Sequence, residues 1–329
     1  MLRAISRTLT RSCNAPAIWK PIQESAGSWE MRRGGATFLT RSFSAQPASA
    51  EKLSTPDPKD HSTYNAADNV MPHPGLRATA SSPEAGGKDK SYWLMQPIYS
   101  KEYVESVEPH HQVPKAFFEK AGYYGVQAMR SLFDVATGYG HQMTEERWLR
   151  RILFLETVAG VPGFVAGMLR HMRSLRSMKR DRGWIHTLLE EAENERMHLL
   201  TFLQFREPGP LMRGTVLLGQ GVFLNFYLLA YTISPRTCHS FVGYLEEEAV
   251  KTYTRCIKDL DAGLIPQWEK KALPEIAIKY WQLSPDATMR DLLLAVRADE
   301  ACHSHVNHAF SHMKPSEENP FLPGTVHVP

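Results

Sequence analysis

The stretch Asn194-Glu195-Arg196-Met197-His198 places a glutamate and a histidine three positions apart, so both lie on one face of a helix. The same face carries Leu188 and Phe202 and is therefore the apolar one. The spacing returns in Asp299-Glu300-Ala301-Cys302-His303, on a second helix whose inward face is also apolar. One such pair arises by chance on many surface helices. Two pairs on separate helices predict a shared buried site.

Two further helices each contribute a glutamate without a histidine partner. Glu156 is the only acidic residue between Glu146 and Asp181, and its helical neighbours are apolar or small. A carboxylate on a buried stripe must be protonated, paired or bound to a metal, since a buried unpaired charge costs several kcal/mol or more. A core salt bridge from Glu156 to Arg151 is the alternative to a metal.

The second of these helices contains Leu245-Glu246-Glu247-Glu248-Ala249. A run of three acids is usually a solvated face, and we expect at most one or two of them to point inward. Glu246 shares its face with Val242 and Tyr253, so we predict that Glu246 is the inward acid.

The order Glu, Glu-x-x-His, Glu, Glu-x-x-His along four helices matches the ligand set of di-iron carboxylate bundles. Four carboxylates balance the charge of two iron ions, two neutral imidazoles each hold one position, and no thiolate is offered that would favour zinc. We therefore expect two Fe ions per chain. The other histidines of the last helix, His305, His308 and His312, are expected on the surface or behind the ligands. The predicted metal ligands are Glu156, Glu195, His198, Glu246, Glu300 and His303.

Apolar periodicity predicts an all-α protein. With the ligand pattern we expect a ferritin-like four-helix di-iron bundle. The second helix begins after Thr144, a suitable N-cap, and Pro162 is expected to kink it. The six expected helices cover about 117–137, 145–170, 183–205, 211–233, 237–260 and 286–313.

The fourth helix raises the question of a membrane span. Residues 214–234 carry no charge and are long enough, at about 20 residues, to cross a bilayer. A crossing would place the third and fifth helices on opposite sides of the membrane, where their acids could not share a site. We therefore expect this helix to lie in one leaflet, aided by the first helix.

The chain begins with a segment typical of a mitochondrial transit peptide, residues 1–45, which is rich in Arg and Ser. Its net charge is +5, which leaves −2 for the rest of a chain whose total is +3. The basic balance therefore does not indicate nucleic acid as a partner. Residues 46–110 are expected to form an extended arm, 111–315 the di-iron helical oxidase domain and 316–329 a C-terminal tail.

The chain resembles the mitochondrial alternative oxidases, the cyanide-insensitive ubiquinol oxidases, over about residues 93–321. The resemblance rests on four ordered blocks: Leu155-Glu156-Thr157 with Val158–Gly163, Asn194–His198, Leu245–Ala249, and Arg297–Ala301 with His303. The six predicted ligands fall on the family's ligand positions.

The resemblance implies two additional membrane-associated helices beside the ferritin-like four-helix di-iron bundle, and a monotopic homodimer in one leaflet of the inner mitochondrial membrane, on its matrix side. It also implies the reaction: two ubiquinols are oxidised and one O2 is reduced to two waters, without proton pumping. Tyr253 falls on the family's redox-active tyrosine. The positions that match the ubiquinol cavity are Arg130, Arg151, Leu155, Glu248, Ala249 and Thr252. Those that match residues supporting the ligands are Asn194, His239, Asp299 and Trp281.

The chain departs from the family at Cys302 and Ser304, where many members carry bulkier or charged residues. Residues 90–149 contain no cysteine, so the disulfide control of plant relatives is not expected. Two rival functions remain open at this point. A di-iron quinone-biosynthesis hydroxylase would share the ligands and the membrane association, and a ferritin-like iron-binding protein would share the bundle.

Overall fold

The structure, a computed structural model, describes residues 93–140 and 142–327. All secondary-structure elements of this part of the chain are α-helices, which confirms the predicted all-α class. The predicted transit peptide and the arm up to residue 92 lie outside the described residues.

Six long helices correspond to the six predicted ones, and three short helices join them. The short helices were not predicted, because a helix of four to seven residues is too short to show a recognisable apolar repeat. The long helices are α3 (Phe117–Thr137), α4 (Glu145–Ser177), α5 (Trp184–Leu203), α6 (Pro210–Ile233), α7 (Pro235–Asp261) and α10 (Met289–His312). The short ones are α2 (Lys101–Ser106), α8 (Pro266–Glu269) and α9 (Glu275–Trp281).

Local chemistry explains where several helices begin and end. The Thr144 side chain accepts a hydrogen bond from the backbone N–H of Arg147 and caps α4. Thr288 and Asp291 form a capping box at the start of α10. Gly138 ends α3 with a left-handed φ of 65°. Helix α4 continues without interruption through Pro162, and the kink expected there stays a prediction.

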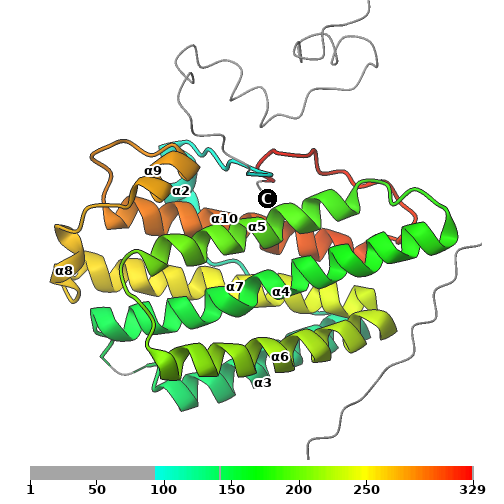
Figure 1. The fold of residues 1–329 in the computed structure, drawn as a ribbon, viewed down its shortest axis with the longest axis horizontal. Coiled ribbons are helices and arrows are strands. Elements are labelled where there is room, and N and C mark those ends of the chain that lie inside the picture. The colour runs from blue at the N-terminus through cyan, green and yellow to red at the C-terminus, as the bar shows by residue number, and fades with distance from the viewer. Residues whose placement is uncertain (1–92, 141, 328–329) are drawn as a thin grey trace, which may run out of the picture. The chain divides into compact units, whose positions relative to one another are not determined.

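The long helices form three layers, with α5 and α10 in the upper layer of Figure 1, α4 and α7 in the middle and α3 and α6 below. Helices α4 and α5 approach closely at two glycines. A Cβ added to Gly163 would lie 2.6 Å from the carbonyl oxygen of Leu188, and one added to Gly160 would lie 3.2 Å from that of Ala192. Small residues therefore allow α4 to bring Glu156 close to α5.

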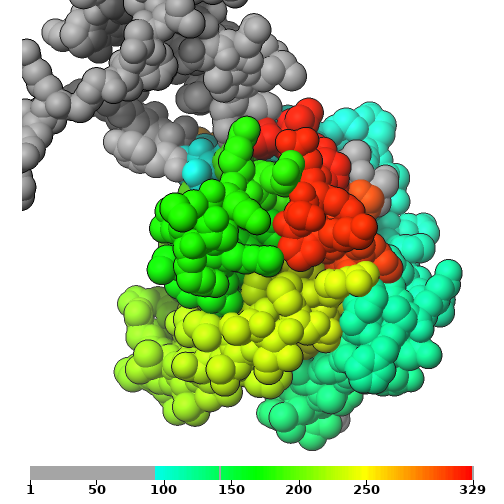
Figure 2. All heavy atoms as spheres, turned by 90° about the vertical axis from the view of Figure 1, so that its right-hand side faces the viewer, coloured from blue at the N-terminus to red at the C-terminus, as the bar shows by residue number. Residues whose placement is uncertain are grey.

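The lower layer has an apolar outer surface. Viewed from one end, α3 and α6 lie at the bottom, with α7 and the C-terminal segment above them (Figure 2). Large apolar side chains of both helices face outward, among them Phe117, Leu132 and Val135 of α3 and Leu217, Phe226 and Ile233 of α6. Helices α4 and α6 are each long and apolar enough to cross a membrane, but 44% of the apolar window of α4 is buried inside the protein, against 11% for α6. Much of the exposed apolar surface thus lies on α3 and α6, and α4 adds Phe164, Met172 and Leu175.

Candidate metal centre

Four side chains from three helices converge inside the bundle. Glu156 of α4, Glu195 and His198 of α5 and Glu300 of α10 are buried, and each offers a ligand atom within 4.8 Å of the others. The Nδ1 atom of His198 lies 3.3 Å from Glu156, 3.5 Å from Glu195 and 3.6 Å from Glu300. This cluster of buried carboxylates and imidazole could hold a metal ion.

The remaining two predicted ligands lie beside this cluster. His303 Nδ1 is 2.9 Å from Glu195 Oε1 and 3.9 Å from Glu300 Oε2. Glu246 of α7 is buried as well. Burial raises the pKa of Glu246 to about 8, and the negative charge of Glu195 adds to the effect. All four core helices therefore contribute to one site.

Several polar atoms of this site make no hydrogen bond of good geometry among the described residues, although Glu195 Oε1 lies in an ion pair with His303 at 2.9 Å. Buried polar atoms are nearly always paired, and each unpaired one costs about 1–3 kcal/mol. The donor set of these atoms, carboxylate oxygens with imidazole nitrogens, suits iron. The atoms are Glu156 Oε2, both carboxylate oxygens of Glu195, His198 Nδ1, Glu300 Oε2 and His303 Nε2.

The electrostatics of the cluster agree with a site built for cations. Burial raises the pKa of Glu156 to about 7 and raises that of Glu300 well above its usual range. Burial would also raise the pKa of Glu195, but the nearby His198 and His303 outweigh it and lower the pKa. Without a metal, the carboxylates therefore hold extra protons or rely on charged histidines for neutralisation.

Asp299 fixes the orientation of His198 from behind. Its Oδ2 atom accepts hydrogen bonds from His198 Nε2 at 2.9 Å, Trp281 Nε1 at 2.8 Å and Asn194 Nδ2 at 3.2 Å. Because Nε2 of His198 donates to Asp299, Nδ1 is the nitrogen that faces the carboxylates. A carboxylate behind a ligating histidine is the usual arrangement that selects its tautomer.

His303 is supported through Asn307. The Asn307 side-chain amide donates to the His303 carbonyl at 3.0 Å and to Glu191, and its oxygen accepts from His239 Nδ1 at 3.0 Å. Burial lowers the pKa of His239 to about 4, so that ring is neutral. His239 therefore reaches the site through Asn307 and not by direct contact.

Tyr253 lies against the cluster on the α7 side. It is buried, and its hydroxyl donates a hydrogen bond to Glu156 Oε1. The face of α7 that carries Glu246 thus also brings a phenol to a predicted ligand, as the spacing of seven residues predicts.

The acidic run of α7 is more buried than the sequence indicates. All three acids are buried, so the run is not the solvated face that such a run usually forms. Glu247 accepts hydrogen bonds from His308 at 2.9 Å and His111 at 2.7 Å, and Glu248 binds Arg130 at 2.6 Å. Glu247 and Glu248 thus bind residues of α10, of α3 and of the segment before α3. Glu246 is the one of the three that faces the metal cluster.

The structure also excludes one alternative and corrects one expectation from the sequence. The alternative salt bridge from Glu156 to Arg151 does not form, since Arg151 pairs with Asp134 at 2.6 Å. The expectation that His308 lies on the surface or behind the ligands is wrong as regards the surface, because His308 is buried, and its ring bonds to Glu247.

The residues expected at the ubiquinol cavity form a polar group between α3, α4 and α7. Arg130 contacts the Glu248 carboxylate and lies 3.4 Å from the Thr252 hydroxyl. Asp134 joins the two arginines, since it binds Arg130 at 3.3 Å and Arg151 at 2.6 Å. Leu155 and Ala249 of the same helices are half-buried. This group lies next to Tyr253 along α7.

A sequence model of the alternative oxidases matches residues 99–312. The chain belongs to the alternative oxidase family. The mitochondrial alternative oxidase of Emericella nidulans is 52% identical over 273 residues, which cover 75% of this chain and 77% of the relative. That of Yarrowia lipolytica is 44% identical over 298 residues, 87% of this chain and 80% of the relative. That of Aspergillus niger is 52% identical over 242 residues, 70% of this chain and 69% of the relative.

Membership of the alternative oxidase family fixes the general activity of the site. The chain is a mitochondrial oxidoreductase that acts as a terminal oxidase. The four ligand-bearing blocks all fall within the matched residues, so the buried cluster lies in the part of the chain that defines the family.

Three residues of the site were not found by sequence reasoning. Asp134 follows Arg130 by one helical turn, and this spacing is a signal that could have indicated it. Glu191 precedes Glu195 by one turn on the same buried face of α5. Tyr99, which donates to Asp299 at 2.5 Å, comes from outside the long helices, and no periodicity indicates it.

Metal binding at this site should depend strongly on pH. Burial raises the pKa of Glu156 to about 7 and that of Glu246 to about 8, so in metal-free protein both gain protons as the pH falls to 6. A metal must displace these protons. Below the pKa of each carboxylate, the proton that must be displaced lowers the metal affinity about ten-fold for each unit by which the pH falls. We expect the Fe²⁺ affinity of metal-free protein, measured anaerobically against a competing chelator, to fall at least about ten-fold from pH 8 to pH 6. An affinity that does not change over this range would contradict the assignment.

Proposed function

We propose that the chain is a ubiquinol:oxygen oxidoreductase, a terminal oxidase that does not pump protons and that works at a di-iron carboxylate centre. The observation that carries the proposal is the buried cluster of carboxylates and imidazoles with unpaired ligand atoms, in a chain of the alternative oxidase family. The overall reaction would oxidise two ubiquinols to two ubiquinones and reduce one O2 to two waters, which balances four electrons and four protons.

Glu156, Glu195, His198, Glu246, Glu300 and His303 would hold the two iron ions. When bound, the irons would take up electrons from the quinol and deliver them to O2. The chain's own contribution is to orient the ligands, since Asp299 fixes the ring of His198, while Asn307 bonds to the backbone carbonyl of His303. Burial of the cluster keeps bulk water away from the redox chemistry.

Tyr253 is proposed to act between the quinol and the cluster. Its hydroxyl already donates to Glu156, so if the phenol gave up an electron toward O2, the terminal acceptor, its proton would pass along this hydrogen bond to the Glu156 carboxylate. A quinol then restores both the electron and the proton. The buried phenol needs this acceptor, because burial raises the pKa of Tyr253 well above its usual range and opposes a free phenolate.

The quinol is proposed to bind at the polar group of Arg130, Glu248 and Thr252, with Arg151 and Asp134 behind it. Cationic and hydroxyl groups there can orient the two quinol oxygens, while Leu155 and Ala249 offer apolar contact to the ring. Helix α3 supplies Arg130, and the same helix exposes Phe117 and Leu132 to the outside. A quinol dissolved in a membrane would thus meet this group next to the apolar surface.

The apolar outer faces of α3 and α6 are proposed to lie in the matrix-side leaflet of the inner mitochondrial membrane. A crossing is disfavoured because α5 and α7, which flank α6 in sequence, both reach the same cluster. Helix α5 carries Glu195 and His198, and Tyr253 of α7 donates to Glu156. An amphipathic layer embedded in one leaflet satisfies both observations. We also propose that the protein is a homodimer, as the resemblance to the family implies.

Purified protein should consume oxygen when ubiquinol is supplied in the presence of cyanide, and it should contain two irons per chain. Replacement of Glu246 by alanine removes a proposed ligand, so we expect both the bound iron and the oxygen uptake to be lost. The exposed Glu269 offers a matched control, because Glu269→Ala should change neither. Iron without ubiquinol oxidation would favour a quinone-biosynthesis hydroxylase or an iron-binding protein. Full activity in Glu246→Ala would refute the ligand assignment.

Replacement of Tyr253 by phenylalanine should separate redox chemistry from metal binding. The ring remains but the hydroxyl is lost, so we expect the iron content to stay at the wild-type level and turnover with ubiquinol to fall at least about 100-fold. Tyr244→Phe is the control on the same helix, since that buried hydroxyl has no hydrogen-bond partner among the described residues. Turnover that survives in Tyr253→Phe would remove the redox role.

A further inference from the structure

Residues 93–112, here called the N-terminal strap, run across the bundle before the first long helix. The strap is held by contacts that fall beside proposed metal ligands on three helices. The backbone N–H of Leu94 donates to Glu193 of α5, the Tyr99 hydroxyl donates to Asp299 of α10, and the backbone N–H of Gln112 donates to Glu247 of α7. These acceptors stand one or two positions from Glu195, Glu300 and Glu246.

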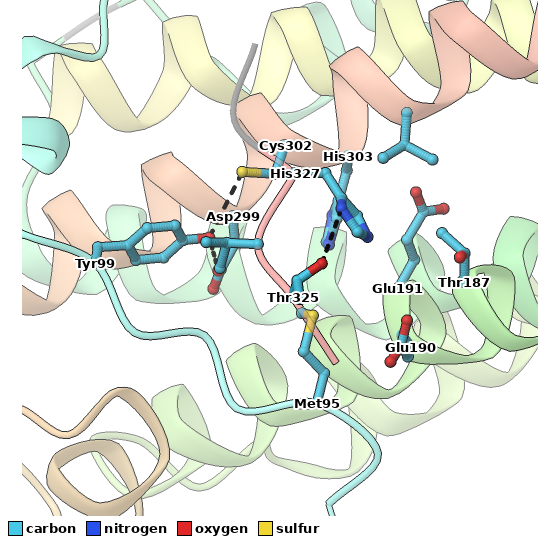
Figure 3. Close-up of a pocket in the computed structure, with 12 residues that line it drawn as sticks. Met95, Tyr99, Thr187, Glu190, Glu191, Asp299, Cys302, His303, Thr325 and His327 are labelled. Carbon is cyan, nitrogen blue, oxygen red and sulfur yellow. Dashed lines mark hydrogen bonds between the residues drawn. The ribbon is translucent and has the colours of Figure 1, made fainter. Parts of the chain in front are cut away.

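Among these contacts, that of Tyr99 has the shortest path to a ligand. The Asp299 carboxylate is fully shielded from solvent, and its two oxygens accept different numbers of hydrogen bonds. Its Oδ2 atom accepts from His198, Trp281 and Asn194, whereas among the described residues only Tyr99 donates to Oδ1, at 2.5 Å. Figure 3 shows the Tyr99 hydroxyl directed at Asp299, at the edge of a pocket that also contains His303.

The hydroxyl of Tyr99 therefore fixes the plane of the Asp299 carboxylate. Without this donor, Oδ1 of a buried carboxylate would be unsatisfied, and the group would turn to find another partner. Any turn moves Oδ2 as well, and with it the acceptor that holds the His198 ring. The path from strap to ligand contains two hydrogen bonds, Tyr99 to Asp299 and His198 to Asp299.

We propose that Tyr99 is a positioning residue of the metal centre, which acts through Asp299 to hold Nδ1 of His198 toward the proposed metal ligands. This inference rests on the proposed metal centre and adds a residue from outside the four-helix core. In this role the strap is part of the site, because its Tyr99 is the one donor to Oδ1 of Asp299 among the described residues.

Tyr103 provides a matched control on the same strap. Its ring stacks on that of Tyr99, with centroids 5.5 Å apart, and its hydroxyl lies 3.9 Å from Cys302 Sγ. The Tyr99 hydroxyl is also near this sulfur, at 3.7 Å, so both tyrosines share the Cys302 contact. Only Tyr99 bonds to Asp299. A comparison of Tyr99→Phe with Tyr103→Phe therefore isolates the bond to Asp299 from packing of the strap.

The experiment measures the Co²⁺ affinity and stoichiometry of full-length metal-free protein in detergent, with thermal unfolding of the same samples. Loss of a group that supports a ligating histidine typically lowers metal affinity 10- to 100-fold. We expect a loss in this range for Tyr99→Phe, with little change for Tyr103→Phe and similar melting temperatures for both metal-free variants.

A double-mutant cycle tests the path through Asp299. If Tyr99 acts through that carboxylate, Tyr99→Phe should cause no further loss of affinity in an Asp299→Asn background. Unchanged affinity in Tyr99→Phe, an equal loss in Tyr103→Phe, or additive losses in the double variant would overturn the proposal. Wild-type protein that binds no Co²⁺ would overturn the metal centre itself, whereas normal wild-type binding with an unaffected Tyr99→Phe would overturn the positioning role alone.

Discussion

Carboxylates buried beside one another cannot all stay charged unless cations lie among them, and this constraint shapes the bundle. Glu156, Glu195 and Glu300 offer oxygens within 4.8 Å of His198 and of one another, inside a core that excludes water. Protons and charged histidines can neutralise the cluster in part, as the raised pKa of Glu156 shows. Two metal ions would neutralise it and also pair the ligand atoms that have no partner. The small residues of α4 help to bring the ligands together, since Gly160 lets Glu156 approach α5.

The surroundings of the cluster differ on its two sides, and the difference fits the proposed chemistry. On the side of α3 and α6, an apolar surface, the paired arginines and Tyr253 are suited to a lipid-soluble quinol. On the other side, Asp299 and Tyr99 of the N-terminal strap form a hydrogen-bonded support that orients His198, and Asn307 bonds to the backbone carbonyl of His303. In the proposed mechanism, electrons would thus enter from one face of the bundle, while the residues that orient the ligands lie on another.

Much of the site could be predicted from the sequence because helical period alone decides which residues share a face. The Glu-x-x-His spacing placed Glu195 with His198, and the distance of seven residues placed Tyr253 on the face of Glu246. The same rule could not show that Glu247 and Glu248 are buried, because this depends on which elements pack around α7. Tyr99 lies 200 residues from Asp299 in the chain and outside the long helices, so only the folded structure joins them.

The central claim is that two metal ions lie among the six predicted ligands. Anomalous X-ray scattering from crystals of the iron-loaded protein, recorded on both sides of the iron absorption edge, tests it most directly. The account predicts two iron peaks, both enclosed by carboxylates of α4, α5, α7 and α10 and each next to one of the histidines His198 and His303. A single peak, or iron bound away from these side chains, would contradict it.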